Sequence, residues 1–338
     1  MKPAHLVPEG VLPRLDPLPD LWPGREVVVD GATTFVREID GRGDVTEPAL
    51  YVHGLGGSSS NWTDLGDLLA DRLAGQAIDL PGFGRSEPAA SYTVPAMARR
   101  ITRWIETSGR GPVHLFANSM GGAAAVLVAA DRPDLIRTLT LISPAMPFLD
   151  PRRSTEGRLV PLLLLPHASR IAAQRFAAIE PADLIRMVIG ACFADPTRFP
   201  EQRMAHAIEE AKLRHTLPWY GDAYTRSLRG LVTSFLRAYL PGAGSLWRAA
   251  RRISVPTLVI AGTRDRLVDV RVGPQVARVI PDSRLLMIDG VGHVPQMEAP
   301  IQVARAVLGL LDECAGTARG ATQPTVAAPG RAAGVAGR

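Results

Sequence analysis

Residues 116–122, Phe-Ala-Asn-Ser-Met-Gly-Gly, decide the fold of this chain, and Ser119 lies at their centre. The apolar run at 112–116 predicts a buried strand that leads into this stretch. The Ala- and Val-rich run at 123–130 predicts a helix that packs on a sheet. A serine is therefore expected on a sharp strand-to-helix turn.

Small residues flank this serine, with Ala117 two positions before it and Gly121 two positions after it. Such a pattern is typical of a nucleophile elbow, in which bulky flanking side chains would collide with neighbouring backbone. Ala117 stands where the usual pattern has glycine, but alanine is small enough for the turn to close. The alternative is a plain turn in which Ser119 only caps the helix.

The chain has 338 residues, of which 46% are hydrophobic and 21% are charged, as in globular proteins. This length allows one large α/β domain with an insertion, or two domains. Two cysteines, Cys192 and Cys314, cannot form a disulfide framework, so we expect free thiols in a reducing compartment. The first residues do not resemble a signal peptide and no apolar run has membrane-spanning length, which predicts a cytoplasmic protein without stable membrane insertion. The net charge of +5 comes mainly from scattered arginines, and the pattern does not indicate a nucleic-acid partner.

Strands and helices alternate in the first part of the chain, after an extended N-terminal arm at residues 1–24. A hairpin is expected within 26–39, and the core over 25–144 is predicted to form a mostly parallel sheet with helices on both faces. The expected strands are 49–52, 76–80 and 138–142, and the expected helices are 63–73 and 94–107.

The alternation stops over residues 145–252, which predicts a helical cap inserted between two strands. Apolar helical segments are expected at 159–165, 171–179, 184–192 and 228–239. The arginines of this region indicate either an electropositive lid or a solvated helix surface. The sheet is expected to resume over 253–313, with strands at 256–261 and 284–288 and helices at 274–280 and 301–313. Residues 314–338 are expected to be disordered because they lack an apolar period.

A glycine-rich loop follows the strand at 49–52 directly. Such a loop can turn its backbone N–H groups toward a cavity, as an oxyanion hole requires. The expected donors are the N–H groups of Leu55 and of Met120, which follows the candidate nucleophile. The alternative is a flexible turn, and the spacing of a phosphate-binding loop is absent. The residues expected to support the loop are His53, Gly54, Gly56, Gly57 and Gly121.

Ser119, Asp265 and His293 occur in the order serine, acid, histidine, and each follows the end of an expected strand. Because the carboxyl ends of parallel strands meet at one edge of a sheet, these side chains are expected to lie together. A serine needs a base to take its proton, and the base needs a carboxylate to orient it. Asp269 is the rival acid, but its position favours a helix start.

Other candidate groups are weaker. Asp79 is expected to shape its own loop together with Arg85, by hydrogen bonding and charge pairing. Four further histidines do not follow the last strand and are weaker candidates for the base: His53, His114, His206 and His215.

The chain resembles the α/β-hydrolase superfamily over roughly residues 25–313. The resemblance lies in the motifs HGLGGSSSNW, DLPGFGRS, ANSMGG, AGTRD and GVGHVPQMEAP. It implies an eight-stranded, largely parallel sheet, a helical cap, and no cofactor or metal. It also implies Ser119 as nucleophile, Asp265 as acid, His293 as base, and the Leu55 and Met120 N–H groups as oxyanion donors. Ser119 argues against the activities of those superfamily members that use an aspartate as nucleophile.

The elbow sequence at 118–122 is similar to that of meta-cleavage-product hydrolases, which cut carbon–carbon bonds. Those enzymes carry a tryptophan after the histidine where this chain has Val294, and Arg203 matches their cap arginine only loosely. Hydrolysis of a medium-sized apolar ester through an acyl-enzyme is therefore favoured. The alternatives are carbon–carbon hydrolysis, a haloperoxidase-like or acyltransferase activity, and a catalytically silent binding protein on the same fold.

Overall fold

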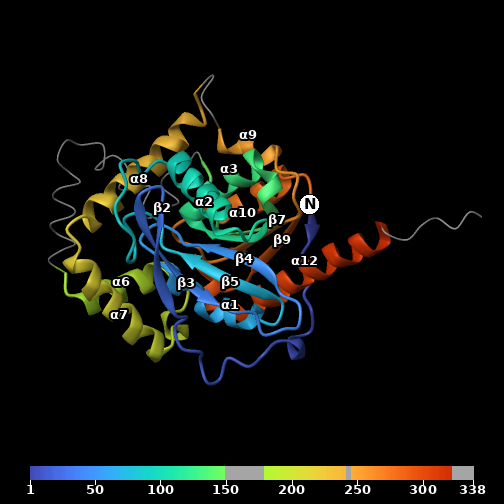
Figure 1. The fold of residues 1–338 in the computed structure, drawn as a ribbon, viewed down its shortest axis with the longest axis horizontal. Helices are drawn as coiled ribbons and strands as arrows, with labels where there is room; N and C mark the ends of the chain where they lie inside the picture. Colours follow the sequence, from blue (N-terminus) through green and yellow to red (C-terminus); the bar gives the residue numbers. More distant parts are fainter. Residues whose placement is uncertain (149–178, 241–244, 322–338) are drawn as a thin grey trace, which may run out of the picture.

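The computed structural model describes residues 1–148, 179–240 and 245–321, and these contain a nine-stranded sheet with helices on both faces (Figure 1). The strand order is β1-β9-β8-β7-β6-β4-β5-β3-β2. The strands are β1 Lys2–Pro3, β2 Gly24–Val29, β3 Ala32–Ile39, β4 Glu47–Val52, β5 Leu73–Ile78, β6 Val113–Asn118, β7 Ile136–Ile142, β8 Thr257–Gly262 and β9 Ser283–Ile288.

The sheet is parallel from β1 through β9, β8, β7, β6 and β4 to β5, while β3 runs antiparallel to both β5 and β2. The mostly parallel sheet and its N-terminal hairpin are thus confirmed. The expected count of eight strands is corrected to nine, because Lys2 pairs with Arg284 and adds β1 at the edge next to β9. That pairing satisfies backbone groups that an edge strand would otherwise leave to solvent.

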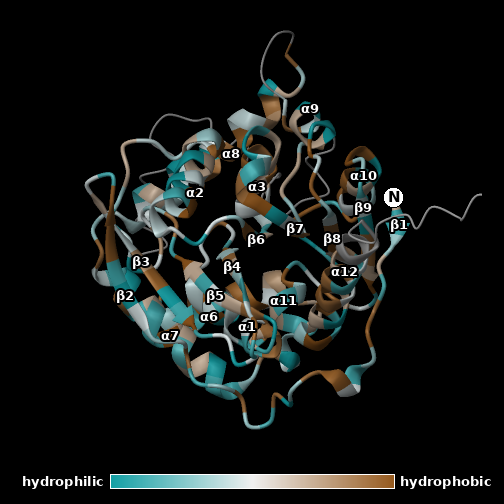
Figure 2. Ribbon diagram, turned by 45° about the vertical axis from the view of Figure 1, so that its right-hand side comes forward, coloured by the Kyte–Doolittle hydropathy of each residue, from teal (hydrophilic) through white to brown (hydrophobic). Residues whose placement is uncertain are grey.

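Helices cover the two faces of the sheet in separate groups (Figure 2). One apolar cluster includes residues of α2, α3, α9 and α10, and a second includes residues of α1 and α12. Helix α3 lies against the middle of the sheet, and its residues from Met120 to Val126 are all buried. The helices around the sheet are α1 Thr63–Leu69, α2 Val94–Ser108, α3 Ser119–Asp131, α9 Leu246–Arg251, α10 Val272–Val279, α11 Pro295–Glu298 and α12 Pro300–Ala321.

Three longer helices lie between β7 and β8, in the region expected to be helical: α6 Pro181–Cys192, α7 Glu201–Thr216 and α8 Tyr220–Arg237. The segments expected at 184–192 and 228–239 correspond to α6 and to the second half of α8. The segment expected at 159–165, and all but the last residue of the one at 171–179, lie outside the described residues. Helix α7 was not predicted, because its charged residues dilute the apolar pattern.

Two helix ends differ from the expectation. Helix α1 ends at Leu69 rather than at Leu73, because Leu73 is buried as the first residue of β5. Helix α12 continues to Ala321 rather than ending at Glu313, so residues 314–321 are helical and not disordered. The stretch at 314–321 has no apolar period, but it also contains no proline, so it can continue the helix that α12 begins.

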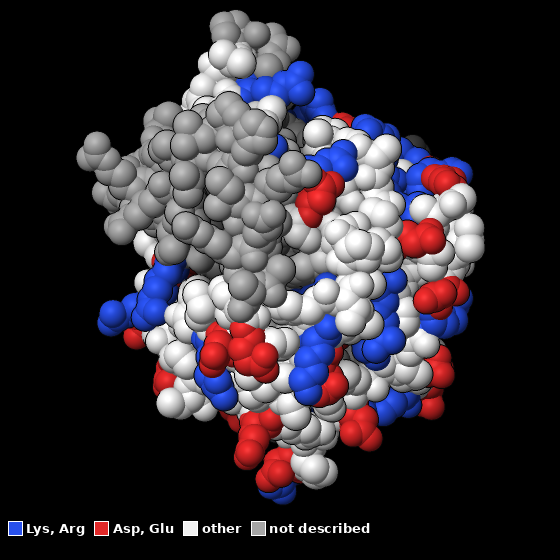
Figure 3. Space-filling view, turned by 90° about the vertical axis from the view of Figure 1, so that its left-hand side faces the viewer, with Lys and Arg blue, Asp and Glu red and all other residues white. Residues whose placement is uncertain are grey.

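The surface of the helical insertion carries both signs of charge. Arg186 pairs with Asp183, Lys212 with Glu209 and Arg226 with Asp222, at 2.7, 2.7 and 3.2 Å. Figure 3 shows acidic and basic side chains interspersed over the described part of this face. The arrangement fits a solvated arginine-rich surface. Among the described helices, none is both long and apolar enough to cross a membrane.

Candidate active site

Ser119 lies at the junction of β6 and α3, on a tight turn. Its φ of 53° is in the left-handed region, which is strained for a residue with a side chain. Backbone crowding explains the small neighbours. A Cβ on Gly121 would come within 2.5 Å of the His53 carbonyl oxygen, and a Cβ on Gly54 within 2.8 Å of Ser119 Cβ. The turn therefore has the geometry expected of a nucleophile elbow.

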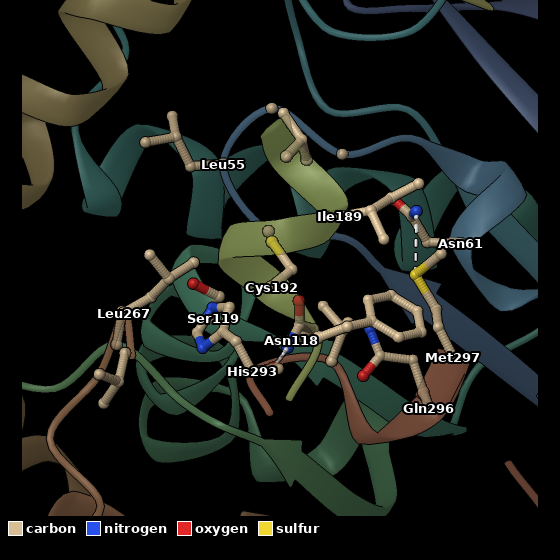
Figure 4. Close-up of a pocket in the computed structure, with 18 of the residues that line it drawn as sticks. Leu55, Asn61, Asn118, Ser119, Ile189, Cys192, Leu267, His293, Gln296 and Met297 are labelled. Carbon is tan, nitrogen blue, oxygen red and sulfur yellow. Dashed lines mark hydrogen bonds between the residues drawn. The ribbon is translucent and has the colours of Figure 1, made fainter. Parts of the chain in front are cut away.

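Asp265 and His293 meet at the ends of β8 and β9. His293 Nδ1 lies 2.8 Å from Asp265 Oδ2, and both side chains are almost fully buried. Because an ionised carboxylate only accepts, Nδ1 carries the proton, which leaves Nε2 as the basic nitrogen of the neutral ring. Figure 4 shows the His293 imidazole beside the Ser119 hydroxyl at the edge of a pocket that both residues line. The structure thus brings together the three residues that the sequence selected.

Backbone groups hold the Asp265 carboxylate in place. Its Oδ1 accepts hydrogen bonds from the N–H groups of Leu267 and Val268, at 2.9 and 3.0 Å. The rival Asp269 instead accepts from the backbone N–H of Arg271 and pairs with its guanidinium at 2.6 Å. The two carboxylates are therefore engaged in different tasks, and it is Asp265 that contacts His293.

The loop after β4 forms a tight turn around Leu55. The N–H of Gly57 donates to the Gly54 carbonyl at 3.1 Å, and Gly56 has a φ of 73°, which this turn reserves for glycine. Leu55 lines the same pocket as Ser119. Met120 is the second residue of α3, so its N–H has no partner within the helix. The role of both N–H groups as oxyanion donors stays a prediction.

His53 supports that loop as a neutral residue. Its Nε2 accepts from the Leu80 N–H at 2.9 Å, so its Nδ1 is protonated and donates to the Gly54 carbonyl at 2.7 Å. Burial lowers the pKa of His53 to about 4. With both ring nitrogens occupied, His53 links the ends of β4 and β5 and is not available as a base.

The other weaker candidates have structural partners, with one exception. His114 lies between Thr138 and Glu47, and His215 bonds the carbonyl of Ala211. His206, by contrast, lines the pocket with Ser119, which its place in the sequence did not predict.

Asp79 shapes its loop, as expected, but through backbone groups. Its carboxylate accepts from the N–H groups of Ser59 and Arg85, at 2.6 and 2.9 Å. Burial raises the pKa of Asp79 to about 6. The expected charge pairing is absent from the ion pairs of the described residues, and the Arg85 guanidinium lies over the Phe35 ring instead.

Two polar residues that sequence reasoning missed hold the His293 loop. Asn118 Nδ2 donates to the carbonyls of Ile142 and His293, at 3.0 and 3.3 Å. The buried Glu298 carboxylate accepts from the N–H groups of Gly292, Ala194 and Asp195, at 2.7, 3.1 and 3.1 Å. The available signal in the sequence was an isolated glutamate within the mostly apolar stretch 294–301. Glu298 connects the loop to the residues that follow α6.

The pocket at Ser119 and His293 has a volume of about 470 Å³, within the usual range for small-molecule sites. Much of its wall comes from the insertion, including Ile185, Ile189, Phe193, Leu231 and Phe235. Across the described parts of the chain, no group of three or more His, Cys, Asp or Glu side chains could hold a metal ion.

Residues 48–300 match the family of the alpha/beta hydrolase fold. The chain belongs to this family. Among its relatives, Lipase 3 of Moraxella sp. (strain TA144) is 27% identical over 75% of this chain and 73% of that protein. Monoacylglycerol lipase abhd6-B of Xenopus laevis is 26% identical, over 79% of this chain and 76% of that protein.

Two further proteins similar to this chain have other activities in their names. The dihydrolipoyllysine-residue acetyltransferase component of the acetoin cleaving system of Cupriavidus necator is 28% identical, over 76% of this chain and 61% of that protein. The solved structure of the meta-cleavage product hydrolase CumD of Pseudomonas fluorescens IP01 superposes with a TM-score of 0.67, over 86% of this chain and 97% of that one. At 16% identity this likeness concerns the fold alone.

Proposed function

We propose that this protein is a serine hydrolase that cleaves carboxylic esters through an acyl-enzyme. Ser119 is the nucleophile, His293 the general base and Asp265 the residue that orients the base. The observation that carries the proposal is the 2.8 Å hydrogen bond between His293 Nδ1 and Asp265 Oδ2, beside Ser119 in one pocket. A buried base held in one tautomer is what a serine needs to lose its proton.

In the first step, Ser119 Oγ bonds to the ester carbonyl carbon while its proton moves to His293 Nε2. The carbon–oxygen bond to the alcohol then breaks, and His293 gives the proton to the departing alcohol. Water next attacks the acyl-enzyme and loses a proton to His293, which returns it to Ser119 Oγ as the carboxylic acid leaves. The N–H groups of Leu55 and Met120 stabilise the negative charge on the carbonyl oxygen in both steps.

The substrate is a medium-sized ester that is apolar on at least one side of the scissile bond. Support comes from the size of the pocket and from the aliphatic and aromatic side chains of α6 and α8 that line it. The lipase names of two relatives support the same class of substrate for this protein. In this proposal residues 145–252 act as a cap that selects the substrate and limits the access of water.

Carbon–carbon hydrolysis is the second candidate, favoured by Arg203, a residue of the insertion that lines the pocket. Two observations weigh against it: the contacts of Arg203 and the residue after the histidine. The Arg203 guanidinium is paired with Asp64 and donates to the Pro19 carbonyl at 2.6 Å, so its charge is largely engaged. Val294 follows the histidine where the carbon–carbon hydrolases have tryptophan.

A fluorophosphonate probe and a panel of p-nitrophenyl esters of rising chain length test the proposal. The wild-type protein should be labelled and should hydrolyse the esters, whereas Ser119→Ala should lose both properties and keep the wild-type thermal unfolding midpoint. Labelling that persists in Ser119→Ala would exclude Ser119 as the nucleophile. Failure of the wild-type protein to hydrolyse any ester, with cleavage of a meta-cleavage product, would favour the second candidate.

A further inference from the structure

The backbone of His293 is held in place as well as its imidazole ring. Its N–H donates to the Cys192 carbonyl at 2.7 Å, at the end of α6, and its carbonyl accepts from Asn118 Nδ2 at 3.3 Å (Figure 4). The N–H of the preceding Gly292 donates to Glu298 Oε2 at 2.7 Å. Because a short side chain joins the ring to this backbone, these contacts restrict where the basic nitrogen Nε2 can lie.

Glu298 differs from the other anchors because it is a carboxylate whose side chain is fully buried, at the end of α11. Its Oε2 accepts from the backbone N–H groups of Gly292 and Ala194, at 2.7 and 3.1 Å. Its Oε1 accepts from the N–H of Asp195 at 3.1 Å and from the Arg198 guanidinium at 3.3 Å. An amide in the same place would offer only one oxygen acceptor and would turn an NH2 group toward these donors.

The two segments that this carboxylate joins touch at their backbones. One is the loop that leads into His293, and the other is residues 192–195 of the insertion. A Cβ on Gly292 would lie 2.3 Å from the Cys192 carbonyl oxygen and 2.7 Å from the Ala194 nitrogen. No side chain therefore separates the segments at this point. Because Gly292 is adjacent to His293 in the chain, a displacement of this contact would reach the imidazole.

Attachment of the insertion does not by itself explain a buried carboxylate at this place. Val294, directly after His293, belongs to an apolar cluster with Ile185 and Ile189 of α6 and with Phe193. That cluster already holds the segments together, and apolar groups in place of a buried ion pair are often at least as stabilising. Hydrogen bonds add a defined position, and the shortest bond of the carboxylate goes to the residue before the histidine.

We infer that Glu298 is a positioning residue for the proposed reaction. It fixes the peptide between Gly292 and His293 against residues 192–195, so that His293 Nε2 stays within reach of the Ser119 hydroxyl. Proton transfer depends on that distance, and a displacement of about 1 Å can cost about 10²-fold in rate. Exchanges of the side chains that line the pocket leave the backbone groups of residues 192–195 in place. This inference rests on the proposed ester hydrolysis.

Glu298→Gln tests the inference in the full-length protein, with complete fluorophosphonate labelling to count the active sites. On p-nitrophenyl hexanoate, kcat per labelled site should fall by about 10- to 100-fold while KM changes by less than about twofold, because a misplaced base slows proton transfer without changing the pocket walls. A role in stability alone would lower the thermal unfolding midpoint and the number of labelled sites, but not kcat per site. Glu87→Gln makes the same change at an exposed glutamate that accepts from the Thr33 N–H at 2.6 Å, and it should keep the wild-type kcat.

A second measurement uses the role of His293 as the acid that protonates the departing alcohol. p-Nitrophenolate can leave without a proton, whereas ethanol must receive one as it departs. Ethyl hexanoate has the same acyl chain, so Glu298→Gln should lower kcat/KM for the ethyl ester at least about fivefold more than for the p-nitrophenyl ester. Glu298→Asp keeps the charge, moves the carboxylate back by one methylene and should show the same pattern with a smaller loss. It replaces Glu298→Gln if that variant does not fold.

The outcomes separate this inference from the proposed function. A wild-type kcat per labelled site in the Glu298 variants, whatever their unfolding midpoints, would overturn the inference and leave ester hydrolysis standing. An equal fall for the two esters would also overturn it, because the loss would then not concern proton transfer by His293. Failure of both variants to fold would assign the carboxylate to folding alone and equally overturn it. If the wild-type protein cleaves neither ester and is not labelled, the proposed function fails and the inference fails with it.

Discussion

The strand-end loops of the sheet and the helices of the insertion face the same pocket, but they are held by different forces. In the loops, backbone groups fix the polar side chains: amides of 267 and 268 hold Asp265, and the Leu80 N–H and Gly54 carbonyl hold His53. In the insertion, the pocket side of α6 and α8 is held mainly by apolar contacts, such as the packing of Phe193 on Phe199 and of Phe148 on Phe235. Backbone hydrogen bonds define positions to a fraction of an ångström, whereas apolar packing tolerates exchange of side chains.

This difference separates chemistry from selectivity. A reaction that depends on proton transfer requires atoms within hydrogen-bond reach, which the loops provide. A pocket that must fit one class of substrate among many requires walls that can vary without disturbing those atoms, which the insertion provides. Substitutions in the loops should therefore change the rate for every ester, and substitutions in the insertion should change which ester is preferred.

The largest effect is expected at the acid. Asp265→Asn should lower kcat by about 10⁴-fold for all esters, because an amide can hold His293 in the wrong tautomer. Asp269→Asn makes the same change at a buried carboxylate that pairs with Arg271 and should cost less than about tenfold. Steady-state kinetics on one p-nitrophenyl ester measure both, with circular dichroism to confirm folding. The reverse ranking would show that the wrong carboxylate was assigned to His293.

The same contrast explains how much the sequence could reveal. Ser119, Asp265 and His293 could be found because each follows an apolar strand, and parallel strands bring their carboxyl ends to one edge. The glycines at 54 and 121 could be found because close backbone approach requires small residues. In both cases a local pattern has one structural explanation.

The polar residues of α7 that line the pocket could not be predicted by this route. Helix α7 has charged residues on most of its faces, and nothing in a single sequence shows which of them point inward. Glu210 finds Ser58 and Ser60 about 150 residues away, and Arg203 finds Asp64 across a similar separation. Partners that only tertiary structure brings together leave no local signal. The short strand β1 was missed for the same reason, since its partner lies in β9.

A smaller effect is expected in the insertion, and it concerns preference and not overall rate. Phe235→Ala removes a ring from the part of the pocket that α8 lines and should shift the preferred acyl chain length by about two or more carbons, because the pocket lengthens there. Met187 is also an apolar residue of the insertion, but it is 59% exposed on α6. Met187→Ala is therefore the matched control.

The panel of p-nitrophenyl esters measures this shift as the profile of kcat/KM against chain length. Phe235→Ala should change the profile and still cleave the acetate ester, while Met187→Ala should reproduce the wild-type profile. A uniform loss over all chain lengths in Phe235→Ala would mean that the insertion positions the catalytic residues, and the division between the two regions would break down.

The smallest effect concerns stability and asks whether the two regions are electrostatically independent. Burial raises the pKa of Asp79 to about 6 from 3.8, and the charge of Glu210 in the insertion raises it further. Between pH about 4 and 6 the folded protein therefore holds a proton that the unfolded chain has released, so this group's contribution to stability is lost as the pH rises. His53 acts in the opposite direction, because burial lowers its pKa to about 4 from 6.5.

Asp79→Asn isolates the first contribution, since His53 is present in both proteins and cancels in the difference. The free energy of unfolding of the wild-type protein minus that of the variant should fall by roughly 1–3 kcal/mol between pH 4 and 6.5. Urea denaturation at four or five pH values measures it. The same difference is then measured between Glu210→Gln and the double variant Glu210→Gln/Asp79→Asn. It should fall by less than in the wild-type background, and the fall should end at a lower pH, because the Glu210 carboxylate no longer raises the pKa of Asp79. An unchanged pH range in the Glu210→Gln background would mean that the charge of Glu210 does not affect the pKa of Asp79. The strand-end loops and the insertion would then be electrostatically independent.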